Sequence, residues 1–449
     1  MAAEGRGRIE VSVPGRVCLF GEHSDWAGGY RRSLPTIEVG KCIVTGTDQK
    51  LYATVEEHPG KLICTATRND GSVEGPWECE MTDAALLAVA KQGGFWSYVA
   101  AVAFQVRTYF PVNGLVLNNY LTTLPMKKGL SSSAAVCVLV ARSFNMVYNL
   151  KMTVRMEMEM AFLGEILTPS RCGRMDQCCA FGSIPHVMTF DGDVLMTEAI
   201  SPPAAPIHLV VVDLGGEKNT LEILNALNKA YPIAEDEVQK GVQKLLGEIN
   251  LRIIDAAVAA IAQGDARSLG ELMREAQQEF DRYAMPACLS QLTSPKLHAL
   301  LADGDLEPFI WGGKGVGSQG DGCAQFVARS KVDLSRFSFC LSVCLSVCLS
   351  VCMSLSLSLS LSLANSLSLS LCLCLSFCLF ISVCLSVCLS MYLSLSFCLS
   401  VFVSVCLCLS LFLSVSVCLS LSRSLSPHER SKVTLSPEAA PQHLGTHTK

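Results

Sequence analysis

Hydrophobic and polar residues alternate in two distinct patterns between residues 9 and 328. Short apolar runs bounded by glycine, proline or polar turns predict strands, whereas apolar residues spaced three or four apart predict helices. The predicted strands cover residues 9–20, 36–45, 50–57, 114–120, 186–190, 207–214 and 323–328. The predicted helices cover residues 95–109, 130–147, 154–167, 219–230, 236–263 and 266–281. This order predicts a mixed α/β (α+β) protein that is long enough to bury a core in two lobes.

Both the strand-like and the helix-like patterns end near Phe337. From there to Ser422 the chain contains no Asp, Glu, Lys or Arg and consists almost wholly of Ser, Leu, Val, Cys and Phe. Ser-Val-Cys-Leu recurs, as at residues 342–345, and Ser alternates strictly with Leu over residues 354–363. A TCTG repeat in DNA encodes the first pattern in one reading frame, and a TC repeat encodes the second. We therefore interpret residues 336–449 as translated simple-sequence DNA that is not part of the fold.

A membrane segment is the alternative interpretation of this tail, because an uncharged stretch longer than about 20 residues can span a bilayer. Against it, the serines recur at every second position, and no basic or aromatic residues flank separate spans. We therefore expect a membrane partner only if the repeat is translated and inserted. Strict alternation is more typical of a strand, and such a strand is prone to aggregate.

Charge and cysteine content narrow the functional classes. The formal net charge is −5 and no strongly basic stretch is present, so we expect no nucleic-acid partner. The N-terminus lacks an apolar signal region, and we expect a cytoplasmic protein. Ten of the 23 cysteines precede Phe337, without a Cys-x-x-Cys pair or zinc spacing. Reduced, mostly buried thiols are expected there.

Three segments concentrate glycine and chemically active side chains. Residues 14–25 read Pro-Gly-Arg-Val-Cys-Leu-Phe-Gly-Glu-His-Ser-Asp, residues 125–135 read Pro-Met-Lys-Lys-Gly-Leu-Ser-Ser-Ser-Ala-Ala, and residues 312–322 read Gly-Gly-Lys-Gly-Val-Gly-Ser-Gln-Gly-Asp-Gly. Together they resemble the three motifs of the GHMP kinases, the family of galactokinase, homoserine kinase, mevalonate kinase and phosphomevalonate kinase. The resemblance covers about residues 11–329, nearly all of the non-repetitive chain.

The resemblance implies a two-domain GHMP kinase fold with the active site in the interdomain cleft. We expect an N-terminal ATP-binding domain at residues 1–203, a C-terminal domain at 204–335 and the repeat tail at 336–449. In the family a further helix follows the last strand, whereas here the repeat begins, so the C-terminal domain is expected to be truncated. The implied reaction is the ATP-dependent phosphorylation of a small-molecule hydroxyl, with Mg²⁺.

The second segment has the features of a phosphate loop. Its serines begin a predicted helix, where free N–H groups and the helix dipole attract anions, and its small side chains let a phosphate approach the backbone. In the family the third segment lies against this loop. The predicted ATP-binding residues are Pro125, Lys127, Lys128, Gly129, Leu130, Ser131, Ser132, Ser133, Gly315 and Gly317.

Residues 164–177 carry the expected catalytic carboxylates. Phosphoryl transfer needs a metal ion that bridges the phosphates and a carboxylate that accepts the substrate proton. The resemblance makes Asp176 the catalytic base, with Glu165 and Ser133 as the Mg²⁺ ligands. Arg16 stands where galactokinases have an arginine and mevalonate kinases a lysine. Its guanidinium can stabilise both ionised Asp176 and the transferring phosphoryl group.

The expected substrate residues are Glu22, His23, Asp25, Gly173 and Arg174. The first three fall where galactokinases read sugar hydroxyls, and a carboxylate suits this task because its oxygens accept hydroxyl protons. Mevalonate kinases have an apolar residue in place of Asp25, so this residue favours a polyhydroxylated substrate. Galactokinases carry an aliphatic residue in place of Arg174, which either contacts an anionic substrate such as a uronic acid or is an ion-paired surface residue.

A galactokinase-type sugar kinase, with a small-molecule sugar and ATP as its partners, is therefore the predicted function. A mevalonate-type isoprenoid kinase is one alternative, disfavoured by Arg16 and Asp25. A non-catalytic, sugar-sensing pseudokinase is the other, disfavoured because a sensor has no need of a complete set of Arg16, Ser133, Glu165 and Asp176.

Overall fold

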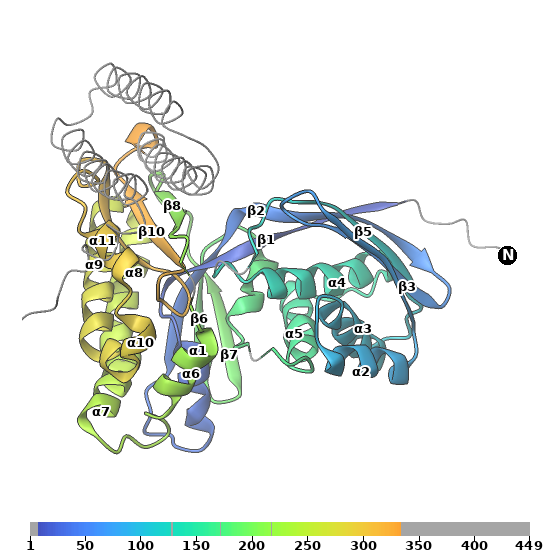
Figure 1. Cartoon of the computed structure of the whole chain (residues 1–449), viewed down its shortest axis with the longest axis horizontal. Coiled ribbons are helices and arrows are strands. Elements are labelled where there is room, and N and C mark those ends of the chain that lie inside the picture. Colours follow the sequence, from blue (N-terminus) through green and yellow to red (C-terminus); the bar gives the residue numbers. More distant parts are fainter. Residues whose placement is uncertain (1–7, 127–128, 171, 217, 334–449) are drawn as a thin grey trace, which may run out of the picture. The chain divides into compact units, whose positions relative to one another are not determined.

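The computed structural model describes residues 8–126, 129–170, 172–216 and 218–333, which belong to one compact unit. A seven-stranded sheet has the order β4-β3-β5-β2-β6-β7, and β1 pairs with β2 (Figure 1). Neighbouring strands are antiparallel except β3 and β5, which run parallel. The strands are β1 (Ile9–Phe20), β2 (Gly40–His58), β3 (Lys61–Thr67), β4 (Val73–Glu80), β5 (Gly114–Thr122), β6 (His186–Asp191) and β7 (Val194–Ala199).

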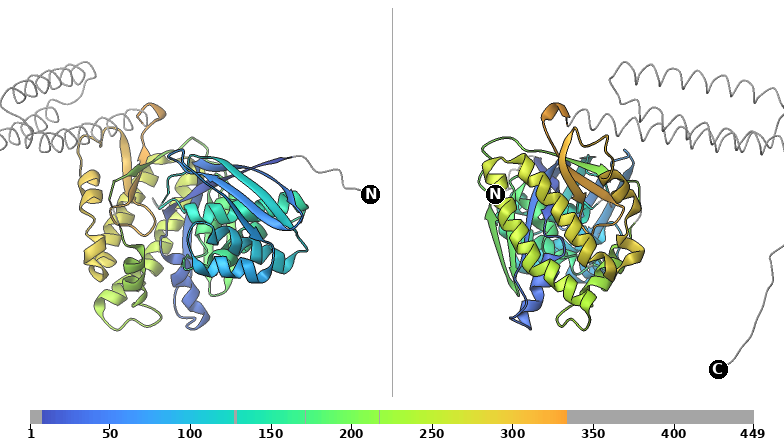
Figure 2. Two further views of the ribbon diagram at one scale, coloured as in Figure 1. Left: turned by 45° about the vertical axis from the view of Figure 1, so that its right-hand side comes forward. Right: turned by 90° about the vertical axis from the view of Figure 1, so that its left-hand side faces the viewer.

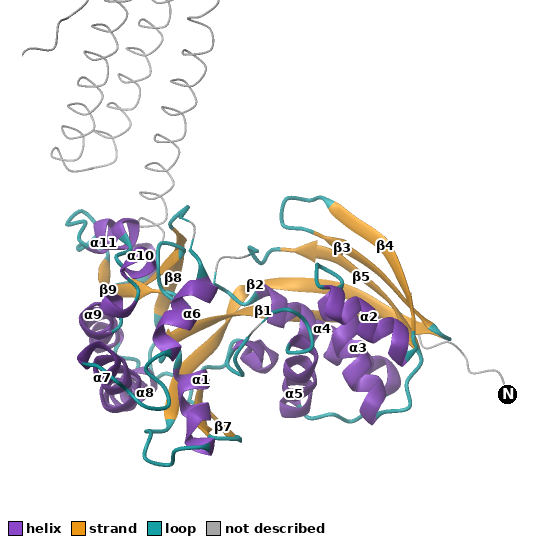
Figure 3. Ribbon diagram, turned by 60° about the horizontal axis from the view of Figure 1, so that its bottom comes forward, coloured by secondary structure: helices purple, strands orange, loops and turns teal. Residues whose placement is uncertain are grey.

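Four helices lie on one face of this sheet (Figures 1 and 3): α2 (Asp83–Gln92), α3 (Ser97–Tyr109), α4 (Ser132–Tyr148) and α5 (Val154–Glu165). α4 packs against β1, α3 and α5, and ten of its side chains are buried, including Cys137, Leu139 and Phe144. A helix that is apolar almost all round must be covered on every side. The sequence of α4 thus explains its central position, and its N-terminus is held at the end of the sheet.

The C-terminal lobe contains a three-stranded antiparallel sheet with the order β8-β10-β9. Helix α9 packs along β9 and β10 (Figure 2). The elements are β8 (His208–Asp213), α6 (Thr220–Asn228), α7 (Glu237–Lys244), α8 (Asn250–Gln263), α9 (Ala266–Tyr283), α10 (Leu289–Leu292), α11 (Pro295–Leu301), β9 (Ile310–Gly315) and β10 (Cys323–Ala328). A short helix, α1 (Ser24–Gly29), follows β1 in the N-terminal lobe.

Buried polar contacts join the two lobes. Gln325 of β10 donates from Nε2 to the carbonyl oxygen of Cys18 at 2.8 Å. Asn250 of α8 donates from Nδ2 to Ser24 Oγ at 2.8 Å and to the carbonyl oxygen of Lys41 at 2.9 Å. Since buried polar groups are costly unless they are paired, these contacts fix the lobes against each other. One hydrophobic cluster also runs through both lobes.

The fold class expected from the sequence is confirmed: the described residues form a mixed α/β fold with two sheets. Most predicted elements begin and end close to the observed ones. The strands β3, β4, β7 and β9 and the helices α1, α2, α10 and α11 were missed, because they are short or carry mixed polar and apolar residues.

Two boundary predictions were wrong, and one glycine-rich segment contains a strand that was not expected. Residues 40–45 of the first run and the run 50–57 belong to the single strand β2, because the residues between them form a bulge opposite Gly15 of β1. The predicted helix 236–263 is divided into α7 and α8 by a π-helical turn at Leu245–Ile249. The glycine segment 312–322 begins as strand β9, where Gly312 lets the backbone pack directly on Gly270 of α9.

The repeat tail lies outside the described residues, and the domain boundary near residue 203 stays a prediction. In the part of the chain that the structure describes, no helix is long and apolar enough to cross a membrane. The ten cysteines before the tail are free thiols, and all are buried except the half-buried Cys172.

Candidate active site

Arg16 and Asp176, the expected catalytic pair, form an ion pair between β1 and the 3-10 helix η2 (Asp176–Phe181). Arg16 Nη2 donates to Asp176 Oδ1 and to Ser131 Oγ. The arginine is only 3% exposed. Burial alone would lower its pKa, but the Asp176 carboxylate holds the pKa above its ordinary value. One buried cation therefore contacts both the expected base and the expected phosphate loop.

The phosphate loop leads into α4 through two left-handed residues, Gly129 (φ 78°) and Ser131 (φ 53°). The carbonyl oxygen of Leu130 accepts a hydrogen bond from the Arg16 N–H at 3.0 Å. Ser131 is the N-cap residue, yet its side chain does not cap the helix and instead accepts the bond from Arg16. The first N–H groups of α4 thus lack a side-chain cap, and such groups are suited to an anion.

The remaining predicted loop residues are only partly covered by the structure. Ser132 and Ser133 are the first two residues of α4, and Pro125 lies between β5 and the loop. Lys127 and Lys128 lie outside the described residues.

Ser133 and Glu165, the expected metal ligands, lie next to each other. The Ser133 hydroxyl hydrogen-bonds Glu165, which is fully buried at the end of α5. Gln177 Nε2 donates to Glu165 Oε2 at 2.9 Å. Burial and the nearby charge of Asp176 raise the pKa of Glu165 above its usual value.

This pair fits Mg²⁺, because it offers hard oxygen ligands and Glu165 Oε1 is buried without a hydrogen-bond partner. Within the described ranges, no cluster of three or more His, Cys, Asp or Glu side chains could hold a metal ion. A magnesium ion bound by Ser133 and Glu165 would therefore complete its coordination with phosphate oxygens and water, as Mg²⁺ does at nucleotide sites.

Asp25, on α1, lies directly against Gly173. A Cβ added at Gly173 would overlap Asp25 Oδ2, so only glycine leaves room for the carboxylate. Burial raises the pKa of Asp25 from its ordinary value of 3.8 to about 6, and the charge of Asp176 adds to this rise. Asp25 is thus a carboxylate held close to Asp176 at an energetic cost.

Glu22 and His23 are less available than the sequence suggested. Glu22 is buried and pairs with Lys314 Nζ of β9. His23 accepts a hydrogen bond at Nδ1 from Trp26 Nε1 (3.2 Å) and stacks on Phe280. Burial lowers the pKa of His23 to about 4, so this imidazole is neutral at physiological pH. Both residues support the site, and Asp25 remains as the expected substrate carboxylate.

Arg174 is turned toward α5. Its Nη2 donates to Glu159 Oε1 at 3.2 Å, and its guanidinium lies 4.8 Å from the centre of the Phe162 ring. This is the ion-paired arrangement, one of the two alternatives expected for this residue. It adds no contact near Asp25.

Gly315 and Gly317 lie on the C-terminal side of the site. The Gly315 N–H donates to Gln277 Oε1 at 2.8 Å, so its backbone is already paired. Gly317 has a φ of 66°, and a Cβ added there would lie 3.6 Å from the carbonyl oxygen of Gly129. The glycine turn therefore lies against the phosphate loop, as the resemblance implied.

Sequence reasoning missed two polar side chains of this region, Lys218 and Gln177. It also missed that Lys314 forms an ion pair with Glu22. Gln177 directly follows Asp176 in the string Met-Asp-Gln, which was the available signal. Lys218 stands alone between β8 and α6. No local pattern could have identified it.

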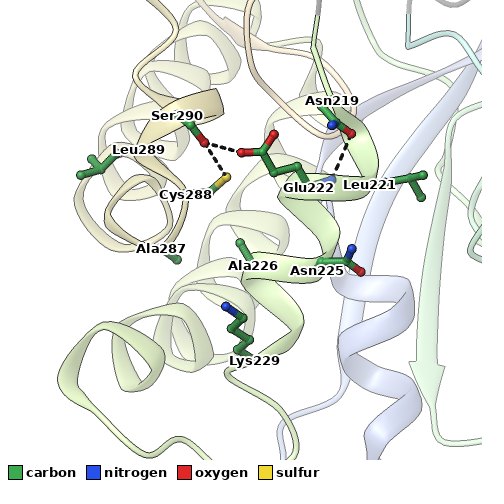
Figure 4. A pocket seen from close by; sticks show the side chains of 10 residues that line it. All are labelled: Asn219, Leu221, Glu222, Asn225, Ala226, Lys229, Ala287, Cys288, Leu289 and Ser290. Atoms are coloured by element: carbon green, nitrogen blue, oxygen red, sulfur yellow. Dashed lines mark hydrogen bonds between the residues drawn. The ribbon is translucent and has the colours of Figure 1, made fainter.

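A pocket of about 600 Å³ lies between α6 and the segment around α10 (Figure 4). It is lined by Asn219, Leu221, Glu222, Asn225, Ala226, Lys229, Ala287, Cys288, Leu289 and Ser290. Ser290 Oγ donates to Glu222 Oε1 at 2.5 Å across it. None of the expected catalytic or nucleotide-binding residues lines this pocket, so we assign it no part in the chemistry.

Comparison with known proteins identifies a family domain and a shared fold. Residues 97–183 match the family model of the GHMP kinases N terminal domain, which spans α3, α4, α5 and η2. The Lactococcus lactis galactokinase solved with galactose matches with a TM-score of 0.56 at 17% identity, over 72% of this chain and 86% of that chain. The Methanococcus jannaschii mevalonate kinase matches with a TM-score of 0.55 at 16% identity, over 75% and 95%.

The Lin0012 protein from Listeria innocua is similar as well, with a TM-score of 0.57 at 17% identity over 74% of this chain and 93% of that chain. At such identities these likenesses show a shared fold and leave the substrate open. Residues 97–183 are therefore a GHMP kinase N-terminal domain, in a chain whose described part has the fold of the GHMP kinases.

Proposed function

We propose that this protein transfers the γ-phosphoryl group of ATP to a hydroxyl group of a sugar. The observation that carries the proposal is the double contact of Arg16, which joins Asp176 to Ser131 of the phosphate loop. A carboxylate held beside a phosphate loop is placed to accept the proton of an acceptor hydroxyl. The family match at residues 97–183 supports the coarser part of the proposal, a small-molecule kinase.

The backbone N–H groups at the start of α4 bind the phosphates, because Ser131 leaves them without a side-chain cap. The acceptor oxygen attacks the γ-phosphorus, the bond from that phosphorus to the β,γ-bridging oxygen breaks, and ADP leaves with that electron pair. Asp176 accepts the hydroxyl proton. Arg16 stabilises the negative charge of the carboxylate and of the transferring group.

Ser133 and Glu165 are the residues that would hold Mg²⁺, which supplies charge neutralisation at the phosphate oxygens when it is bound. Gln177 fixes the orientation of Glu165 through its 2.9 Å hydrogen bond. Without that bond a buried carboxylate could turn away from the loop.

Asp25 supports a sugar as the acceptor. It lies near Asp176 on a half-buried residue, and its oxygens can accept hydrogen bonds from the hydroxyl groups of a bound substrate. The carboxylate already interacts with the backbone of Trp26 and Met175, and a substrate without neighbouring hydroxyls would leave its remaining acceptor sites unused, which is the kind of loss that gives discrimination. Mevalonate and homoserine are such hydroxyl-poor acids.

The test is ADP release by the full-length chain with a panel of hexoses, pentoses and uronic acids, compared with mevalonate and homoserine. We expect a neutral sugar to react fastest. Asp25→Ala should weaken sugar use by about 1 to 3 kcal/mol, because hydroxyl contacts are lost, and should spare ATP binding. Asp193→Ala is the matched control, since that side chain is 73% exposed and pairs only with Arg32 in the described structure.

A preference for mevalonate would refute the proposal that the acceptor is a sugar, but it would leave the proposed kinase activity standing. Sugar binding without ADP release would instead support a sensor. A preference for uronic acids would require Arg174 to leave Glu159 and contact the substrate.

A further inference from the structure

Lys218 lies where the two glycine-rich segments of the site meet. Its Nζ donates to the carbonyl oxygen of Val316 at 3.2 Å. The same atom would lie 3.7 Å from a Cβ built on Gly129, 3.8 Å from one on Gly317 and 3.3 Å from one on Gly322. An ammonium group from the C-terminal lobe is thus placed beside Gly129 of the phosphate loop.

Other cations of the site already have carboxylate partners. Arg16 is paired with Asp176, and Lys314 is paired with Glu22. For Lys218, the described part of the chain provides one hydrogen-bond acceptor, the uncharged carbonyl of Val316. An ammonium has three N–H donors, so two remain to be satisfied.

The surroundings of Lys218 make an anionic ligand favourable. Its enclosure lowers the pKa of its ammonium from 10.5 to about 8, and the nearby charge of Arg16 acts in the same direction. The charge of Glu22 partly offsets this lowering, but Glu22 is already paired with Lys314, so no carboxylate of the described residues is left to pair with Lys218 alone. A phosphate oxygen beside Gly129 would supply both the missing charge and the missing acceptors.

We propose that Lys218 binds the terminal phosphate of the nucleotide and, as a catalytic residue, stabilises the phosphoryl group during transfer. This inference rests on the proposed kinase function. Arg16 and Lys218 would contact the terminal phosphate from the N-terminal and C-terminal lobes, respectively. The site would therefore be complete only when both lobes contribute.

The experiment measures the affinity of the full-length chain for Mg-AMPPNP and Mg-ADP by titration calorimetry, with ADP release as a second readout. Lys218→Met should weaken AMPPNP binding by about 10- to 100-fold, the usual effect of losing a charge-assisted hydrogen bond, and ADP binding far less. Lys218→Arg should keep most of the affinity. Lys229→Met is the matched control, because it removes the same charge from the exposed end of α6.

A second measurement does not depend on the methionine variant. Because binding a phosphate favours the ammonium form, wild-type affinity for AMPPNP should fall as pH rises from 7 to 9, and Lys218→Arg should abolish this fall. The other charged or titratable groups that face Lys218 are Arg16, Glu22, Cys323 and His23, and all four are retained in the arginine variant.

Equal AMPPNP affinity of wild type and Lys218→Met would overturn the proposal. Equal weakening of AMPPNP and ADP would also overturn it, since Lys218 would then act on the loop and not on the terminal phosphate. In both cases the wild type still binds nucleotide and the proposed function stands. A wild type that binds neither nucleotide would refute the proposed function itself.

Discussion

Asp25→Asn should stabilise the protein at neutral pH. Enclosure raises the pKa of Asp25 from 3.8 to about 6, so the folded state resists ionising this group more than the unfolded state does. Above pH 6 the folded protein holds an unfavourable charge, and below pH 4 the carboxyl is neutral in both states. The destabilisation is therefore complete above pH 6 and disappears as the pH falls to 4.

The rise from 3.8 to about 6 corresponds to about 3 kcal/mol, at about 1.4 kcal/mol per pKa unit. Asparagine has the same shape and cannot ionise, so Asp25→Asn should gain up to this amount at pH 7.5 and almost nothing at pH 4. Urea unfolding of the full-length chain, followed by tryptophan fluorescence at both pH values, measures the difference. Asp193→Asn should change stability by less than about 1 kcal/mol, as is typical for exposed ion pairs.

The charge of Asp176, which is the second cause of the raised pKa of Asp25, allows a further check. Because the charge of Asp176 also raises the pKa of Asp25, the gain from Asp25→Asn should shrink when Asp176→Asn is already present. A gain of the same size at pH 4 and pH 7.5, or no gain at pH 7.5, would refute the reasoning. Loss of sugar phosphorylation should accompany the gain, since the destabilising carboxylate is the one assigned to the substrate.

Three further predictions concern the other charged groups. Asp176→Asn should lower turnover by about 10² to 10⁴ with little change in nucleotide affinity, and near-normal ADP release would show that another group is the base. Glu165→Gln should raise the Mg²⁺ concentration needed for half-maximal rate; an unchanged Mg²⁺ dependence would exclude Glu165 as a ligand. Lys314→Met should cost about 3 to 5 kcal/mol in urea unfolding because it leaves Glu22 buried and unpaired. Adding Glu22→Gln should recover most of that loss, and no recovery would mean that the lysine contributes mainly by packing.

The residues that belong to a recognisable local sequence motif could be predicted from the sequence. The serine loop before α4 and the segment with Glu165 and Asp176 combine residue types in an order that few structural elements require, and the structure brings Ser133 next to Glu165. The apolar α4 and the strand β1 were equally clear, because their patterns are long and uninterrupted.

Contacts between distant segments were not predictable. Glu22 and Lys314 are 292 positions apart, and Lys218 is 98 positions from its acceptor Val316. A single sequence shows the type of a side chain but not which distant partner takes up its charge. For this reason Glu22 was expected to bind substrate, whereas in the structure its carboxylate pairs with Lys314.

The buried hydrogen bonds between the lobes have a consequence for how the protein comes apart. Gln325 and Asn250 of the C-terminal lobe each bond to main chain or side chains of the N-terminal lobe, inside a hydrophobic cluster that both lobes share. Separating the lobes would expose these amides and the apolar surface around them in one step. We expect the core amides of β1 and of β10 to exchange with solvent deuterium at the same free energy of opening, as parts of a single cooperative unit.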